Sequence, residues 1–188
     1  MRTNYKISFL FSMILTILGC QNDYPKEPKL IHKEYGKWDA SYDSLGVELE
    51  LSQFKNFEDL LKRTEIIDCN DSVPKIILKT DLELKTIYFR SPCMNVGCYD
   101  KRNVIIIHDD TISIPNEFYY PMDSLEDLLK RNIENNGKNE YLSVSPNKLV
   151  IFISYNNDGL EKLPITLYKI VQAYEKITNK TDVKIVLE

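Results

Sequence analysis

The stretch that decides the fold is Val104-Ile-Ile-Ile-His-Asp-Asp-Thr-Ile-Ser-Ile114. A β-branched run over 104–107 is followed by His108 and two aspartates, and the apolar pattern then resumes. Two such runs on either side of a short polar break predict a β-hairpin. The pair Asp109-Asp110 is a weaker turn signal than Asp-Gly, but it marks the turn of this hairpin.

The residues after the hairpin alternate between helix and strand patterns. Asp123 is placed to cap a helix, and Glu126 three residues later completes a capping box. Pro164 suits the first turn of a second helix. The expected elements are a helix over 123–133, a buried strand over 149–153, a helix over 164–177 and a closing strand over 183–187.

The residues before the hairpin give a similar mixture. Val47, Leu49 and Leu51 alternate with polar residues, which is the period of a half-buried strand. A helix over 54–66 and strands over 75–78 and 84–89 follow. The sequence therefore predicts an α+β fold, a mixed β-sheet with two or three helices packed on one face.

The order of elements over 104–188 resembles the periplasmic domain of the ExbD/TolR family. In that family a hairpin is followed by a helix, a buried strand, a second helix and a last strand. The family also has a transmembrane helix with an aspartate, whereas residues 7–18 hold no acid here. The resemblance implies a shared fold, and it implies TonB/Tol-type transport as one alternative function.

The N-terminus has the features of a secretory signal. Arg2 and Lys6 precede a run of twelve residues without a charge, 7–18. That run is shorter than the roughly 20 residues that span a bilayer, and it fits a signal-peptide apolar region. It ends in Gly19-Cys20, which resembles the bacterial lipobox. The resemblance implies a signal peptide over 1–19, cleavage between Gly19 and Cys20, and acyl chains such as palmitate on Cys20.

Composition indicates where such a lipoprotein resides. Lys outnumbers Arg and only two alanines occur, a composition typical of an AT-rich genome. No aspartate follows Cys20 to signal inner-membrane retention. These features resemble an outer-membrane lipoprotein of a Bacteroidetes-type bacterium, with the membrane leaflet left open. Removing the signal takes away two basic residues and no acid, so the net charge falls from −4 to −6. This acidity argues against a nucleic-acid binder.

The mature chain divides into a lipidated N-terminus and tether, 20–46, and a single α+β domain, 47–188. The tether segment is rich in Pro, Gly and charged residues and has no sustained apolar period. Tyr35, Trp38 and Tyr42 interrupt its polarity. We expect these aromatic residues to dock the end of the tether on the domain, and ligand stacking is the alternative.

Three cysteines besides Cys20 are disulfide candidates, because export places them outside the reducing cytosol. Cys93 and Cys98 are close in sequence around Gly97, so a local bridge is the first expectation. A bridge from Cys69 to the same loop is the competing pairing, and free thiols are the third alternative. The spacing does not match the short paired cysteines of zinc sites, so no metal site is predicted.

Residues suited to catalysis are scarce. His32 lies in the tether segment, and His108 lies beside Asp109 and Asp110, where a general base or a solvated turn would look alike. No nucleophile elbow, phosphate loop or metalloprotease motif is present. We therefore predict no catalytic residue, no cofactor and no enzyme activity.

The function expected from these patterns is a lipid-anchored binding or accessory module of the envelope. It would act by protein–protein contact, including a homodimer through a sheet edge. Tyr119 and Tyr120, at the end of the hairpin, suit such contact because tyrosine joins an apolar ring to a polar tip. A peptidoglycan- or glycan-binding lipoprotein is a further alternative.

Overall fold

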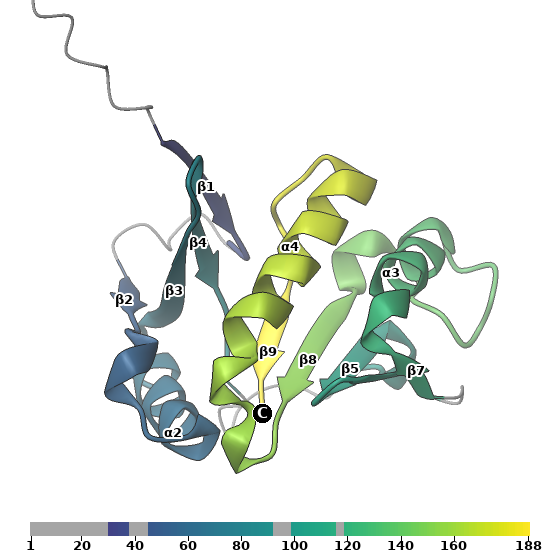
Figure 1. The fold of residues 1–188 in the computed structure, drawn as a ribbon. Helices are drawn as coiled ribbons and strands as arrows, with labels where there is room; N and C mark the ends of the chain where they lie inside the picture. The colour runs from purple at the N-terminus through teal and green to yellow at the C-terminus, as the bar shows by residue number, and fades with distance from the viewer. Residues whose placement is uncertain (1–29, 38–44, 92–98, 116–118) are drawn as a thin grey trace, which may run out of the picture.

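The computed structural model describes residues 30–37, 45–91, 99–115 and 119–188. These residues form two mixed β-sheets and three α-helices, with short 3-10 turns between them (Figure 1). The predicted α+β class is therefore confirmed. The single expected sheet is replaced by two, because the strands before and after residue 91 pair among themselves.

The first sheet has the strand order β1-β4-β3-β2. The strands are β1 (Ile31–Tyr35), β2 (Gly46–Glu48), β3 (Val73–Lys79) and β4 (Glu83–Tyr88). β3 and β4 form an antiparallel hairpin, and β1 and β2 run parallel to their neighbours at the two edges.

Strand β1 corrects the predicted boundary of the tether, which placed residues 31–35 outside the domain. Its charged residues hid the strand pattern, but Tyr35 is fully buried. Gly36 ends the strand with φ +79, in the left-handed region that favours glycine. The Gly36 amide donates to the Thr181 carbonyl at 2.9 Å, so the segment is held against the C-terminal part of the chain.

The second sheet has the strand order β7-β6-β5-β8-β9. The strands are β5 (Val104–His108), β6 (Thr111–Ser113), β7 (Tyr119–Pro121), β8 (Val150–Ser154) and β9 (Ile185–Leu187). β5 and β6 form the predicted hairpin, with Asp109 at φ +51 in its turn. β5, β8 and β9 are mutually parallel, so their carboxyl ends share one edge.

The helices are α2 (Phe57–Asp68), α3 (Leu125–Glu134) and α4 (Leu163–Thr178). One hydrophobic core contains side chains of all three helices and of both sheets. Figure 1 shows α4 crossing in front of β9, between the two sheets. Among the described residues, no helix combines the length and the apolar character needed to cross a membrane.

The two sheets meet at β9. Arg90, just past the end of β4, forms an isolated parallel bridge with Val186. Its amide donates to the Ile185 carbonyl at 3.0 Å, and its carbonyl accepts from the Leu187 amide at 2.8 Å. The strands of the first sheet are therefore fixed to the C-terminal strand by backbone hydrogen bonds.

Two helix starts differ from the sequence prediction. The predicted capping box is wrong: α3 begins at Leu125 after a 3-10 turn over Met122–Ser124, and the N-cap residue Ser124 makes no side-chain cap. The 3-10 turn takes up the residues that the capping box requires in extended form. α2 begins later than expected, because the Asn56 side chain accepts from the Asp59 amide and caps it there.

Candidate binding groove along α4

The exposed face of α4 carries a row of lysines. Lys162, Lys169 and Lys176 lie seven residues apart, beginning at the N-cap. Seven residues are about two turns and roughly 10.5 Å of helix, so the three side chains share one face. Most apolar residues of α4 point into the core, Ile165 being exposed, and the lysine row lies at the surface.

A row of carboxylates faces these lysines, and each comes from a different segment. Asp110, in the β5–β6 turn, accepts from the Lys162 ammonium at 2.6 Å. Glu126, in the first turn of α3, accepts from Lys176 at 2.6 Å. Asp123 lies 4.0 Å from Lys169. The hydrogen bond to Asp110 raises the pKa of Lys162.

Three adjoining hollows lie between the two rows. Their volumes are about 440, 380 and 350 Å³ from the start of α4 towards its end. Asp110 and Lys162 line both the first and the second, and Met122, Asp123 and Lys169 line both the second and the third. The hollows therefore adjoin one another along α4, and we call the three together the α4 groove.

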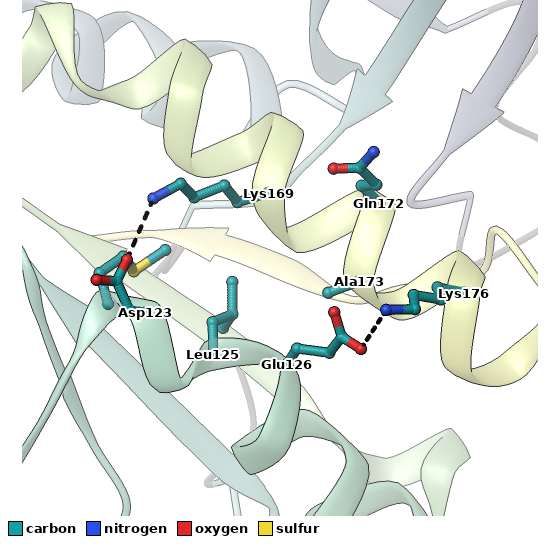
Figure 2. Close-up of a pocket in the computed structure, with 8 residues that line it drawn as sticks. Asp123, Leu125, Glu126, Lys169, Gln172, Ala173 and Lys176 are labelled. Atoms are coloured by element: carbon teal, nitrogen blue, oxygen red, sulfur yellow. Dashed lines mark hydrogen bonds and ion pairs between the residues drawn. The ribbon is translucent and has the colours of Figure 1, made fainter.

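Figure 2 shows the third section of the α4 groove. Asp123, in the 3-10 turn before α3, and Glu126, in the first turn of α3, face Lys169 and Lys176 of α4. Leu125 lies between the two helices. Charged side chains thus line both walls above a partly apolar floor.

The middle of the α4 groove differs from its ends. The Asp123 side chain is 96% exposed, and its ion pair with Lys169 is the longest of the three across the groove. Ile165, beside Lys169, is 62% exposed. Because an exposed ion pair contributes only about 0–1 kcal/mol, Lys169 can exchange Asp123 for another carboxylate at little cost.

A polar network holds the other side of α4 against the first sheet. Tyr35 donates to Glu175 at 2.7 Å, and Lys33 donates to the second oxygen of Glu175 at 2.8 Å. The buried Lys85 donates to the Tyr35 hydroxyl at 3.1 Å and lies 2.7 Å from Glu83. Burial, followed by the hydrogen bond to Glu175, raises the pKa of Tyr35.

This network explains how the N-terminal end of the domain is fixed. The Lys85 ammonium also lies 5.2 Å from the Tyr35 ring centre and 5.4 Å from that of Tyr168. Tyr35 therefore docks β1 as the sequence predicted. Trp38 and Tyr42 lie outside the described residues.

The histidines do not form a catalytic arrangement. His108 Nδ1 lies 3.0 Å from the Ser154 hydroxyl, and its Nε2 lies 3.7 Å from Asp109. That second distance is too long for a hydrogen bond that would orient a general base. Asp109 instead accepts from the Asn156 side-chain amide at 2.6 Å. His32 is hydrogen-bonded to Thr86 at 2.9 Å, remote in the chain from His108.

Cys69, the C-cap of α2, is disulfide-bonded. The other disulfide candidates, Cys93 and Cys98, lie outside the described residues, as do Gly19 and Cys20. The local Cys93–Cys98 bridge and the competing bridge from Cys69 to that loop therefore both stay predictions.

Contacts next to Cys69 bring a distant part of the chain to this helix end. Asp68 accepts from the Ser91 amide at 2.8 Å and pairs with Arg90 at 2.8 Å. Burial raises the pKa of Asp68, against the opposing effect of these two partners. Ser91 therefore lies beside the end of α2, in contact with Asp68, the residue that precedes Cys69.

Metal ligands do not gather in the described part of the chain. No group of three or more His, Cys, Asp or Glu side chains able to hold a metal ion occurs there.

Comparison with protein families, with curated proteins and with solved structures returned no match. The lipoprotein and ExbD/TolR interpretations therefore stay predictions. The predicted hairpin, helix, strand, helix and strand over 104–188 occur in that order, with one strand that was not predicted, β7, between the hairpin and α3.

The α4 groove was missed from the sequence. The seven-residue spacing of the lysines was visible there, but their acidic partners come from a turn, a 3-10 turn and a helix. Only the packing of α3 and the β5–β6 turn beside α4 identifies these carboxylates as one wall.

Proposed function

We propose that this protein is a lipid-anchored binding module of the bacterial cell envelope. Acyl chains on Cys20 hold it at the outer membrane, and the α4 groove binds a segment of another envelope protein. The observation that carries this proposal is the row of three lysines facing three carboxylates, with the exposed Ile165 at its centre.

The chemistry of the groove favours a protein segment as its ligand. Ile165 and Met122 offer apolar contact beside Lys169. A ligand segment with an apolar side chain followed closely by a carboxylate fits this surface. The apolar side chain contacts Ile165 and Met122, and the carboxylate replaces Asp123 as the partner of Lys169. The outer ion pairs, at Lys162 and Lys176, then limit the segment at either end.

The anchor is supported by the order of the N-terminal features. A basic start, a short apolar run and Gly19-Cys20 follow one another as in bacterial lipoproteins. One acyl chain binds membranes only reversibly, whereas two or three chains anchor a protein stably. Metabolic acyl labelling tests this directly: the label is expected on the wild-type protein and lost in Cys20→Ser.

Site-specific photocrosslinking in the native host tests the groove. A benzophenone side chain at position 165 is expected to capture a discrete envelope protein, whereas the same group at position 66 is not. Ile66 is the matched control, because it is 53% exposed and lies on α2, away from the groove.

Charge reversal makes the test specific. Lys169→Glu is expected to lower the yield of the crosslinked product at least fivefold, and Lys138→Glu, in an exposed loop, is expected to leave it unchanged. Equal products from positions 165 and 66, or equal yields in the two charge variants, would refute groove binding and leave the anchor untouched.

A component of TonB/Tol-type transport is the second candidate function. The order of elements over 104–188 favours it, since the ExbD/TolR resemblance implies that order. A deletion strain tests this candidate: it requires reduced uptake of TonB-dependent substrates, and normal uptake would exclude it.

A further inference from the structure

An apolar tip stands at one end of the first sheet. Leu30, Ile31 and Leu82 are 37%, 56% and 66% exposed. The Ile31 amide donates to the Leu82 carbonyl at 3.0 Å, so the start of β1 and the β3–β4 turn lie side by side. We call these three residues the β1 tip.

The β1 tip projects from the domain. Figure 1 shows the start of β1 and the β3–β4 turn together at the end of the molecule opposite α2. The charges around it offset one another. Lys79 and Asp81 are both exposed on the turn, and Lys33 is tied to Glu175 and Glu83. The tip is therefore an apolar surface without excess charge.

The position of the β1 tip along the chain identifies what covers it. Leu30 lies ten positions after Cys20. At about 3.3–3.6 Å per residue, this stretch reaches roughly 36 Å at most. Of the described residues, Leu30 and Ile31 are the first that follow the proposed acyl anchor, and the hydrogen bond from Ile31 to Leu82 places Leu82 beside them. Ile66 and Ile165, which are also exposed, come later in the chain than Leu30 and Ile31.

We propose that the β1 tip is a second membrane contact, inserting its aliphatic side chains at the boundary between lipid headgroups and acyl chains. This inference rests on the proposed anchor. Three partly exposed side chains bind a bilayer weakly alone, but a short tether keeps them at high effective concentration there. The contact fixes the orientation of the domain, with α2 and the start of α4 away from the membrane.

Tryptophan quenching in vesicles tests this contact. Lipidated full-length mature protein is placed in phosphatidylethanolamine vesicles that carry brominated acyl chains, with Trp38→Phe to remove the native fluorophore. Leu82→Trp reports from the β1 tip and Ile66→Trp from α2. The proposal predicts that the brominated chains lower the fluorescence of Leu82→Trp at least twofold. They are expected to lower the fluorescence of Ile66→Trp by less than a tenth.

Second-site variants separate insertion from misfolding. Ile31→Asp is expected to halve the quenching of Leu82→Trp, and Ile66→Asp is expected to leave it unchanged. Both variants are first shown to melt cooperatively. Loss of quenching in both, or in neither, would contradict a contact made by the β1 tip.

Flotation of the same vesicles distinguishes the possible failures. Protein that floats without quenching of Leu82→Trp overturns the β1 tip contact and leaves the anchor intact. Protein that does not float overturns the anchor, and the tip contact with it. Unquenched Leu82→Trp together with crosslinked dimers would assign the β1 tip to a second copy of the chain and overturn the membrane contact.

Discussion

Helix α4 carries lysine–carboxylate pairs on two sides, and the two sets differ in burial. Towards the first sheet, Glu175 is held by Tyr35 and Lys33, and the neighbouring Lys85 is only 3% exposed. Across the α4 groove, Lys169 and Asp123 stand largely in solvent. The same chemistry thus occurs in a part-buried network, in which Lys33 and Glu175 are 33% and 27% exposed beside the buried Lys85, and in a more exposed row.

The difference in burial assigns the two sets different tasks. A buried charge that loses its partner keeps its desolvation penalty, so the network fixes β1 to α4. An exposed pair is screened by water and contributes little, so its members remain available to a ligand. The comparison therefore predicts that the network determines stability and the groove determines binding.

The largest effect is expected from Lys85→Ala. The substitution removes a buried ammonium and its aliphatic stem, which pack against Tyr35 and Tyr168. We expect the free energy of unfolding to fall by about 3–5 kcal/mol in denaturant titration, the cost of breaking a buried pair. A decrease of less than about 1 kcal/mol would show that Lys85 contributes no more than an exposed ion pair, and would contradict the proposed difference between the two sets.

A smaller loss is expected from Tyr35→Phe. The ring stays in the core, but Glu175 loses a donor and the buried Lys85 loses an acceptor. Hydrogen bonds to charged groups contribute about 1.5–3 kcal/mol, so we expect a loss of about 2 kcal/mol in denaturant titration. Tyr119→Phe, at an exposed edge strand, is the matched control with no expected change.

The network also predicts a dependence of stability on pH. The hydrogen bonds from Lys33 and then Tyr35 hold the pKa of Glu175 below its ordinary value of 4.5. Its folded-state pKa is depressed, so its contribution is present above the unfolded pKa and is lost as the pH falls through the folded one. Glu175→Gln is expected to flatten this acid-induced loss of stability in melting curves recorded between pH 6 and pH 3.

The smallest effect on stability is expected in the α4 groove. Lys169→Ala is expected to change the free energy of unfolding by no more than about 0.5 kcal/mol, because its partner Asp123 is exposed. Denaturant titration beside Lys85→Ala measures the contrast. A loss above about 2 kcal/mol would show that the groove pairs are structural.

The sequence predicts the second sheet better than the first. The hairpin, β8, α4 and β9 follow from apolar runs near their observed positions. β1 was missed because Lys33 and Glu34 alternate with few apolar residues, and the partner of Lys33 is Glu175, 142 positions away. Periodicity cannot show that a charge is paired within the fold when the opposite charge comes from a distant helix.

The groove depends on tertiary packing in the same way. The spacing of Lys162, Lys169 and Lys176 places one wall, since a helix repeats almost every seven residues. The other wall includes Asp123, which the sequence assigned to a capping box. The 3-10 turn over Met122–Ser124 instead leaves that carboxylate free to face α4.

The most direct test of the central claim measures stability and crosslinking in one variant, Lys169→Glu. The account predicts a free energy of unfolding within about 0.5 kcal/mol of the wild type, as for an exposed pair, together with at least a fivefold loss of the product crosslinked from position 165. A full yield of that product in a protein of normal stability would contradict the claim that the exposed row of α4 binds the partner.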